Sequence, residues 1–359
     1  MSSNSSRSWW RTIIVAAIAF IFVVGLVQFR GPEEVTAYPA NRVLRSAVLD
    51  GIIYKLADDG NVFRVIDERG TWTLVDRMFD PAEIARDFVK VGDEVFRVDI
   101  ESGKRYLLLK HFEEGFEGIP EGAAGLRSLI GDERKWTEFT LQTPQTPNVS
   151  EYVELRKRIL SENADFLDAS VAPSSLLFHG GQQSLRCICP AKSSNMICAK
   201  ASLGTGFICF EEGDDIWFQA WYRIEGPTRP FTLADIEGRH VKESPGIRLM
   251  LFDGNQLGVE LKALDKPKYR QTAGDAIDFP IDKWVQVTWH VALHPDAGKV
   301  QVWQDDRLVV DTTGPTLPFS GIMYNSLEVG ISAHSFGDQP ATLFVDDVVI
   351  TTKPLKESL

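Results

Sequence analysis

The sequence predicts an all-β protein: an antiparallel β-sandwich or jelly roll, preceded by a small β-rich module and an N-terminal transmembrane helix. From about residue 165 to residue 352, short stretches of alternating apolar and polar residues follow one another with turn residues between them. No long helical pattern interrupts these stretches. The chain has 44% hydrophobic and 25% charged residues, which is typical of a globular protein. One segment near the N-terminus differs, because it contains no charged residue.

The uncharged segment covers residues 12–29. As a helix it would span about 27 Å, close to the thickness of a bilayer core. Trp9 and Trp10 precede it where aromatic rings favour the membrane interface, and Arg7 and Arg11 favour a cytoplasmic N-terminus. We therefore expect a single-pass protein whose bulk, after about residue 31, is periplasmic or extracellular. The alternatives are a cleaved signal peptide, whose apolar region would be unusually long, and a buried core helix.

Residues 1–30 are thus expected to form the cytoplasmic tip and the anchor, residues 31–42 a linker, and residues 43–112 a small β-repeat module. The sequence Val-Phe-Arg-Val at residues 62–65 recurs at residues 95–98. Its alternation, followed by glycine turns, predicts β-hairpins. Two copies are too few for a closed propeller or a solenoid. We expect a small sandwich or barrel, or a plug-like module on the main domain. Its role is either adhesion or docking, or that of a structural spacer.

Residues 113–164 are rich in Gly, Pro and Glu and are expected to form a connector with one helix. Asn148, with Glu151 three residues later, resembles a capping box, and apolar residues at helical spacing continue to about residue 163. The sandwich domain then covers residues 165–352. Its expected strands include residues 184–189, 216–224, 246–252, 258–263, 284–293, 299–304, 308–312, 326–332 and 342–351.

The charge balance disfavours one class of partner. The chain has 38 basic and 50 acidic residues, for a net charge of −12. Nucleic-acid-binding proteins gain most of their affinity from basic residues that neutralise phosphates, so we expect no nucleic-acid partner.

The four cysteines are too few for a disulfide scaffold and lack the paired spacing of common zinc modules. An exported compartment permits disulfides, so we expect Cys187 and Cys189 to pair with Cys198 and Cys209. Free buried thiols and a zinc site are the alternatives.

Several segments of the sandwich domain resemble the concanavalin A-like jelly roll of the heparinase and glucuronan-lyase-like polysaccharide lyases. They are residues 165–168 with 179–186, the strand Gly-Asp-Asp-Ile-Trp-Phe-Gln-Ala-Trp-Tyr-Arg-Ile at 213–224, the pair 284–291 and 298–308, and the closing strand 344–350. Asp305 and Asp306 stand where the family usually has Asp-Gly, and the residues before 165 have no counterpart in these lyases. The resemblance implies a jelly roll that engages a polysaccharide. Binders and enzymes share these segments, so it leaves activity open.

Alternation along each strand separates the core from an outer face. In residues 284–293, Val285, Val287 and Trp289 are expected to face inward, and Gln286 and His290 outward. The other strands give an outer set of aromatic and planar polar side chains, which suits a saccharide because rings stack on sugars and polar groups bond hydroxyls. The expected substrate-binding residues are Trp217, Gln219, Trp221, Arg223, Glu260, Lys262 and Trp303. They share one groove unless some of their strands belong to the opposite sheet.

β-Elimination of a uronic-acid polymer needs a group that neutralises the carboxylate, a base and an acid. Arg248, Lys262 and Gln286 are the candidates for neutralisation, and His290 and Tyr269 for base and acid. The resembled lyases use His, Tyr, Arg and Gln in these roles, which implies a polysaccharide lyase. Together with the segment at residues 12–29, the expectation is a membrane-anchored lyase. The alternatives are a non-catalytic, lectin-like glycan-binding or adhesion protein, and a scaffold that binds no sugar. Hydrolysis is disfavoured because the adjacent acidic pairs of the sequence lie on alternate faces of a strand.

The resemblance also implies a structural Ca²⁺ that joins the first and last strands of the jelly roll. Asp165, Asp168 and Asp347 stand at the matching places, and Ca²⁺ prefers carboxylate and carbonyl oxygens. The sequence contains no twelve-residue calcium loop, and turn or strand-end aspartates are the alternative interpretation. No organic cofactor is expected.

Overall fold

The structure is a computed structural model. It describes residues 33–35, 43–49, 52–57, 61–65, 72–77, 88–91, 94–98, 105–131, 135–227, 229–239, 244–252, 255–262, 267–318, 322–335 and 339–356. The predicted transmembrane segment at 12–29 lies outside these residues. Within them, no helix has both the length and the apolar character needed to span a membrane.

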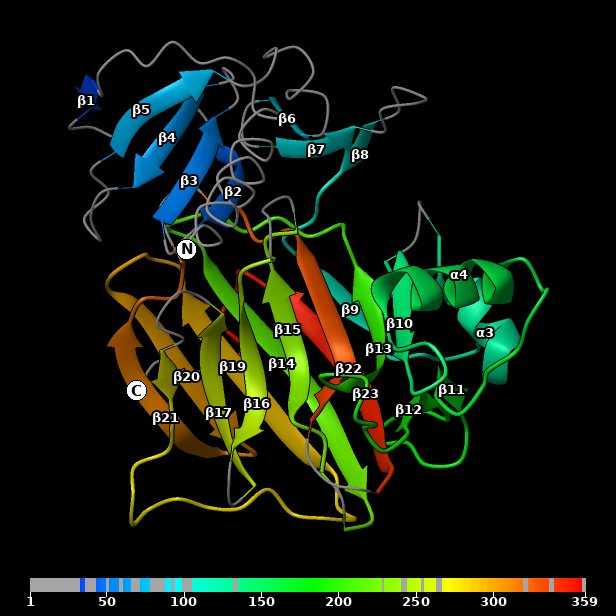
Figure 1. The fold of residues 1–359 in the computed structure, drawn as a ribbon. Helices are drawn as coiled ribbons and strands as arrows, with labels where there is room; N and C mark the ends of the chain where they lie inside the picture. The colour runs from blue at the N-terminus through cyan, green and yellow to red at the C-terminus, as the bar shows by residue number, and fades with distance from the viewer. Residues whose placement is uncertain are drawn as a thin grey trace, which may run out of the picture.

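Two antiparallel sheets packed face to face form the main part of the protein (Figure 1). One is a seven-stranded sheet of β10 (Glu138–Gln142), β13 (Ala199–Thr205), β22 (Ser326–His334), β15 (Thr232–Glu237), β16 (Gly246–Phe252), β17 (Gln256–Lys262) and β18 (Lys268–Tyr269), in spatial order. The other sheet contains β11 (Ser170–Ser174), β12 (Ser184–Cys189), β23 (Ala341–Thr351), β14 (Asp215–Glu225), β19 (Val285–Ala292), β20 (Gly298–Gln304) and β21 (Arg307–Gly314), with β9 (Phe112–Glu114) paired to β23. The predicted antiparallel β-sandwich is therefore confirmed.

The inner faces of the two sheets share one hydrophobic core. Val287 and Trp289 on β19 are fully buried in it, as the alternation predicts, and so is Phe218 on the neighbouring strand β14. The rings of Phe218 and Trp289 meet edge to face at 6.3 Å. Because side chains alternate along a strand, this arrangement sends every second residue to the outer face of its sheet.

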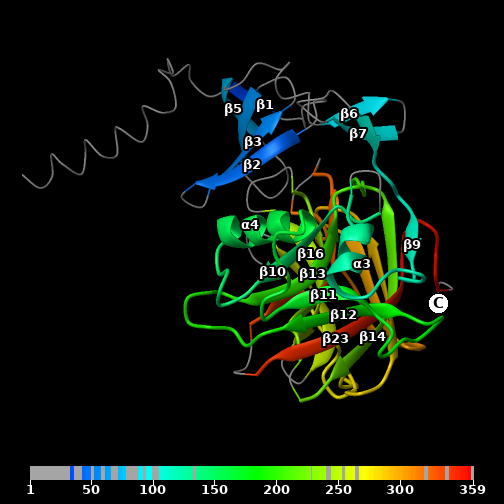
Figure 2. The same cartoon turned by 90° about the vertical axis from the view of Figure 1, so that its right-hand side faces the viewer.

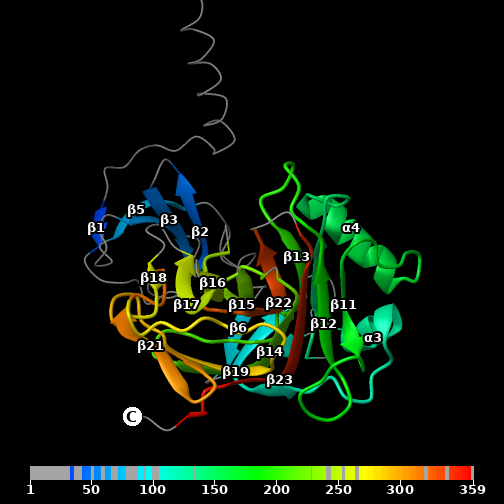
Figure 3. The same cartoon turned by 90° about the horizontal axis from the view of Figure 1, so that it is seen from below.

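The residues expected to form a connector contribute to both sheets. Besides β9 and β10 they form two helices, α3 (Gly122–Leu129) and α4 (Val149–Leu160), which lie at one side of the sandwich (Figure 3). The helix expected after Asn148 is α4, and the Asn148 N–H donates to Glu151 Oε2 at 3.2 Å. Leu155 and Ile159 pack into the core, which holds α4 against β10 (Figure 2).

Two small antiparallel sheets precede the sandwich in the chain. The first contains β1 (Glu33–Val35), β5 (Trp72–Arg77), β4 (Asn61–Val65), β3 (Ile52–Ala57) and β2 (Val43–Leu49), and the second contains β6 (Phe88–Val91), β7 (Glu94–Val98) and β8 (Arg105–Leu107). The two repeated Val-Phe-Arg-Val segments are strands β4 and β7, each paired on both sides. The repeat therefore forms hairpins in two separate sheets, and β1 lies within the expected linker.

Candidate functional site

The predicted site residues lie on two outer faces that point away from each other. Arg248 on β16 and Glu260 and Lys262 on β17 belong to the seven-stranded sheet. The other sheet carries Trp217, Gln219, Trp221, Arg223, Gln286, His290 and Trp303. The shared core separates the two groups, so the single groove is not formed. Alternation fixes which residues face outward, but it does not tell which sheet a strand joins.

The three tryptophans predicted to bind substrate, Trp217, Trp221 and Trp303, already stack on other rings. Trp217 stacks on His290 at 4.2 Å and on Trp303 at 5.7 Å, and both tryptophans are buried. Trp221 stacks on His179 at 3.6 Å with an interplanar angle of 12°. A sugar ring needs an open aromatic face. These rings therefore stabilise one another on the outside of the eight-stranded sheet.

The polar residues of this face are bonded within the protein. His290 Nδ1 lies 3.0 Å from Gln301 Oε1, and its Nε2 lies 2.7 Å from Asp215 Oδ1. Gln219 donates to Thr288 Oγ1 at 2.9 Å. Gln286 accepts from Lys356 at 3.3 Å, and Arg223 donates to the Asp282 carbonyl.

Tyr269 faces the core from β18, at the edge of the seven-stranded sheet. Its hydroxyl donates to the Pro315 carbonyl at 2.6 Å, and burial raises the pKa of Tyr269 to about 12. Its neighbour Lys268, which is opposite Glu260 in the strand register, points to the outer face instead. The structure therefore does not bring Tyr269, His290 and Arg248 together.

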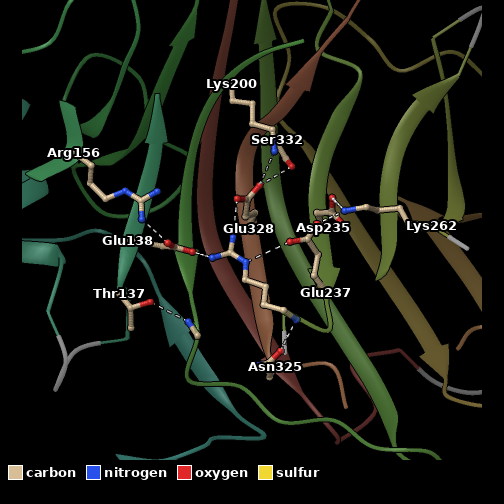
Figure 4. Close-up of polar contacts among 12 residues, drawn as sticks. Thr137, Glu138, Arg156, Lys200, Asp235, Glu237, Lys262, Asn325, Glu328 and Ser332 are labelled. Carbon is tan, nitrogen blue, oxygen red and sulfur yellow. Dashed lines mark hydrogen bonds and ion pairs between the residues drawn. The ribbon is translucent and has the colours of Figure 1, made fainter. Parts of the chain in front are cut away.

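A row of charged side chains crosses the outer face of the seven-stranded sheet (Figure 4). One register line takes a single residue from each strand: Glu138, Gly204, Glu328, Asp235, Arg248, Glu260 and Lys268. All of them are charged except the glycine. We call these six charged side chains, together with the surrounding Arg156, Lys200, Glu237, Arg239 and Lys262, the charged face. It combines five carboxylates with six cations.

Arg239, just after β15, joins three strands of the charged face. Its guanidinium bonds Glu138, reaches Glu328 Oε1 at 2.9 Å and lies 3.4 Å from Glu237 Oε2. Its backbone N–H donates to Asn325 Oδ1 at 2.8 Å, which fixes the start of the side chain. Arg156 on α4 bonds the other oxygen of Glu138, so α4 is tied to the same network.

Two glycines leave room for these contacts. Lys262 is opposite Gly246 in the register, and its side chain extends across β16 to bond Glu237 and to reach Asp235 Oδ2 at 3.1 Å on β15. A Cβ on Gly204 would lie 3.0 Å from Glu138 Cγ, which shows that the Glu138 side chain lies over Gly204. The absence of a side chain at these two positions therefore lets charges meet across an intervening strand.

Neighbouring charges give the carboxyls of the charged face opposite pKa shifts. Burial opposes ionisation of Glu328, but the Lys200 ammonium and the Arg239 guanidinium outweigh it and lower the pKa of Glu328 to about 2. Burial, together with the nearby Asp235 carboxylate, raises the pKa of Glu237 to about 7. Burial also raises the pKa of Asp235, whose Oδ1 has no hydrogen-bond partner among the described residues.

The far end of the row has a surplus of cations. Glu260 is bonded by Arg248 and lies 3.3 Å from Lys268 Nζ. Arg248 also lies over the ring of Phe231, with its Cζ 5.5 Å from the ring centroid. Lys268 is the most exposed cation of the charged face.

Sequence reasoning missed most of the charged face. The missed residues are Glu138, Arg156, Lys200, Asp235, Glu237, Arg239, Glu328 and the exposed end residue Lys268. Alternation could have found some of them: residues 326–332 are an expected strand in which Glu328 faces outward. The segment 232–237 has the same pattern, with Asp235 and Glu237 opposite to Ala234 and Ile236.

No disulfide joins the four cysteines, all of which lie in the described part of the chain. Cys187 and Cys189 point into the core from β12, and burial raises the pKa of the Cys187 thiol to about 12. Cys209 lies in a separate small cluster, with its Sγ 3.1 Å from Met323 Sδ. The expected pairing of the first two cysteines with the last two is therefore not formed.

The three aspartates expected to bind Ca²⁺ are not brought together. Strands β11 and β23 run in the same direction, with β12 between them. Asp168 lies before the first residue of β11, whereas Asp347 is level with the end of β11, near Ser174. The five residues of β11 span about 17 Å, whereas Ca²⁺–oxygen distances are about 2.4 Å. One ion cannot bind both. Asp347 Oδ2 instead lies 3.0 Å from His179 Nδ1, and no group of three His, Cys, Asp or Glu within the described ranges is arranged to hold a metal.

No family model and no curated protein matches the sequence. Several solved structures have a similar fold. The cellulose induced protein Cip1 is 13% identical over 69% of this chain and 100% of that chain, with a TM-score of 0.44. The endo-β-1,4-glucuronan lyase of the fungus Trichoderma reesei is 12% identical over 61% and 96%, with a TM-score of 0.41. An alginate lyase of Klebsiella pneumoniae is 10% identical over 63% and 99%, with a TM-score of 0.39.

Proposed function

We propose that this chain is a jelly-roll protein that binds a uronic-acid polysaccharide through the charged face. The observation that carries the proposal is the register line from Glu138 to Lys268, which places a charged group on every strand but one. At about 4.8 Å between strands, the line extends for about 29 Å, enough for several sugar units of an extended polymer. We also propose that residues 12–29 anchor the protein in a membrane, with the charged face outside the cytoplasm.

The chemistry of the charged face suits such a ligand. Arg239, Arg248 and the lysines present donors that match carboxylates, and Arg can do so in a bidentate manner. Glu138, the most exposed carboxylate of the charged face, can accept hydrogen bonds from sugar hydroxyls. At one end of the row two cations, Arg248 and Lys268, share a single carboxylate, Glu260, so positive charge is in surplus there.

Replacing Lys268 with alanine is expected to weaken binding to alginate by roughly threefold to tenfold. Lys268 is the most exposed cation of the row, so its loss removes a ligand contact while Arg248 still neutralises Glu260. The measurement is the retardation of the full chain in affinity gels that contain alginate, hyaluronan, heparin or glucuronan.

The matched control is Lys299→Ala. Lys299 is also a partly exposed lysine paired with one carboxylate, Asp311, but it lies on the eight-stranded sheet. Its replacement is expected to leave retardation unchanged, as is His290→Ala. Equal losses for Lys268→Ala and Lys299→Ala would contradict the charged face as the binding surface, and no retardation of the wild-type chain in any gel would refute the proposal.

A β-eliminating lyase is the second candidate, and Tyr152 on α4 favours it. Burial raises the pKa of Tyr152, and the charges of Lys200 and Arg156 act on its hydroxyl in the opposite direction. A tyrosine hydroxyl keeps its proton at neutral pH, so it can serve as the acid that protonates the leaving oxygen. If the chain is a lyase, an unsaturated-uronate absorbance is expected with the wild type and with Tyr269→Phe, and its loss in Tyr152→Phe. A flat trace together with retardation leaves a lectin-like binder.

A further inference from the structure

Within the charged face, the ratio of carboxylates to cations differs between two neighbouring sites. At Lys262, one ammonium is shared by two carboxylates, Asp235 and Glu237. At Glu260, one carboxylate is shared by two cations, Arg248 and Lys268. Both sites lie on adjoining strands of the same face. They differ in the number of carboxylates for each cation. Only the first has more negative than positive charge.

The charged groups around Glu237 come from every neighbouring element. Asp235 is two residues away on the same strand, Glu328 is on β22, and Lys262 reaches across from β17. Arg239 lies 3.4 Å away, and Lys200 and Tyr152 act from β13 and α4. The cations Arg239 and Lys200 also bind Glu328, whose low pKa keeps it ionised. On β16, Arg248 is opposite Asp235 in the register, but it is bonded to Glu260. Glu237 and Asp235 therefore share Lys262.

Two buried carboxylates that share one cation cannot both ionise cheaply, because like charges in a poorly solvated site repel each other. One proton relieves this repulsion. The bond from Lys262 to Asp235 at 3.1 Å does not need Glu237, and Arg239 keeps Glu138 and Glu328 as partners without it. Glu237 and Asp235 are therefore the two members of the network that can each accept a proton while every cation keeps a carboxylate. The Glu237 side chain is the more exposed of the two, at 11% against 4% for Asp235.

We propose that Glu237 is a proton-operated gate of the charged face: when it is protonated, Lys262 and Arg239 become available to a carboxylate of the polysaccharide. This inference rests on the proposed function and adds a regulation to it. Proton uptake raises the net charge of the face by one and removes a negative charge that competes with the ligand for both cations. Since burial and Asp235 set the pKa of Glu237 at about 7, the gate would open as the pH falls through neutrality.

The test compares the affinity of the full chain for alginate at pH 6 and pH 8. The wild type is expected to bind roughly fivefold more tightly at pH 6. The variant Glu237→Gln mimics the protonated carboxyl, and its affinity is expected to be high and nearly equal at the two pH values. The matched control is Glu260→Gln, which removes a carboxylate from the same face and is expected to keep the pH dependence of the wild type.

Each outcome decides between the proposals. Equal binding by the wild type at the two pH values, or an unchanged pH dependence in Glu237→Gln, overturns the gate and leaves the proposed binding function in place. No binding of the wild type at either pH to alginate, hyaluronan, heparin or glucuronan overturns the gate together with the uronate-binding function. The proton itself has a readout without ligand: a carboxyl carbon resonance, absent in Glu237→Gln, is expected to titrate near pH 7, and titration near pH 4.5 would overturn the gate.

Discussion

Replacing Glu328 with alanine is expected to lower the free energy of unfolding by about 3–5 kcal/mol. Glu328 is buried, accepts from Arg239 and from the Ser332 hydroxyl at 2.9 Å each, and lies 3.7 Å from Lys200 Nζ. Its loss leaves the Lys200 ammonium without the carboxylate it pairs with and takes one of three carboxylates from the Arg239 guanidinium, in a poorly solvated site. The measurement is urea unfolding of the full chain, followed by tryptophan fluorescence.

The matched control is Asp311→Ala on the eight-stranded sheet. Asp311 also pairs with a lysine, Lys299, but the two side chains are 44% and 36% exposed. Solvent screens such a pair, so its loss is expected to cost about 1 kcal/mol or less. A cost for Glu328→Ala as small as that for Asp311→Ala would contradict the idea that Glu328 anchors the network.

Urea unfolding at several pH values tests the role of Glu328 in a second way. The pKa of Glu328 is lowered from 4.5 to about 2, so its contribution is present above pH 4.5 and is lost as the pH falls through 2. The pKa of Glu237 is raised to about 7, so its contribution is full below pH 4.5 and is lost as the pH rises through 7. In Glu328→Ala, the free energy of unfolding should therefore change less with pH below 4.5 than in the wild type. In Glu237→Gln, it should change less between pH 4.5 and 7.

The sandwich could be predicted because its core pattern is local. In residues 285–292, four apolar residues alternate with polar ones, and this alone requires one buried and one outer face. The pattern does not tell which sheet a strand joins, because that depends on pairing between strands that are distant in sequence. Strand β15, for example, pairs with β16, which follows it directly, and with β22, which begins about 90 residues later in the chain. The assignment of His290 and Arg248 to one groove failed for this reason.

The charged face was largely hidden for a related reason. Glu237 and Glu328 are distant in sequence and are brought together by the pairing of β15 with β22 and by Arg239, so no spacing rule connects them. Lys262 reaches Glu237 across a strand whose residue at that level is Gly246. A glycine in a strand signals a close approach of other groups, but it does not tell which groups approach.

Replacing Gly246 with alanine is expected to lower the free energy of unfolding by about 2–3 kcal/mol. A Cβ at this position would lie 2.2 Å from the Ile236 carbonyl oxygen and 3.0 Å from Glu237 Cα, both backbone atoms of β15. Backbone cannot rotate away as a side chain can, so β15 and β16 must separate locally. The shift would displace Glu237 from Lys262, so the variant should also lose part of the pH dependence of alginate binding.

Gly115→Ala separates this steric effect from the general cost of replacing a glycine. The nearest atom to a Cβ on Gly115 is Asp347 Oδ1 at 3.7 Å, an ordinary contact, so a change within about 0.5 kcal/mol is expected. Equal stabilities of Gly246→Ala and wild type would show that β15 and β16 can move apart at little cost. In that case the contact between Lys262 and Glu237 would not depend on the glycine, and the proton gate would have to survive in the Gly246→Ala variant.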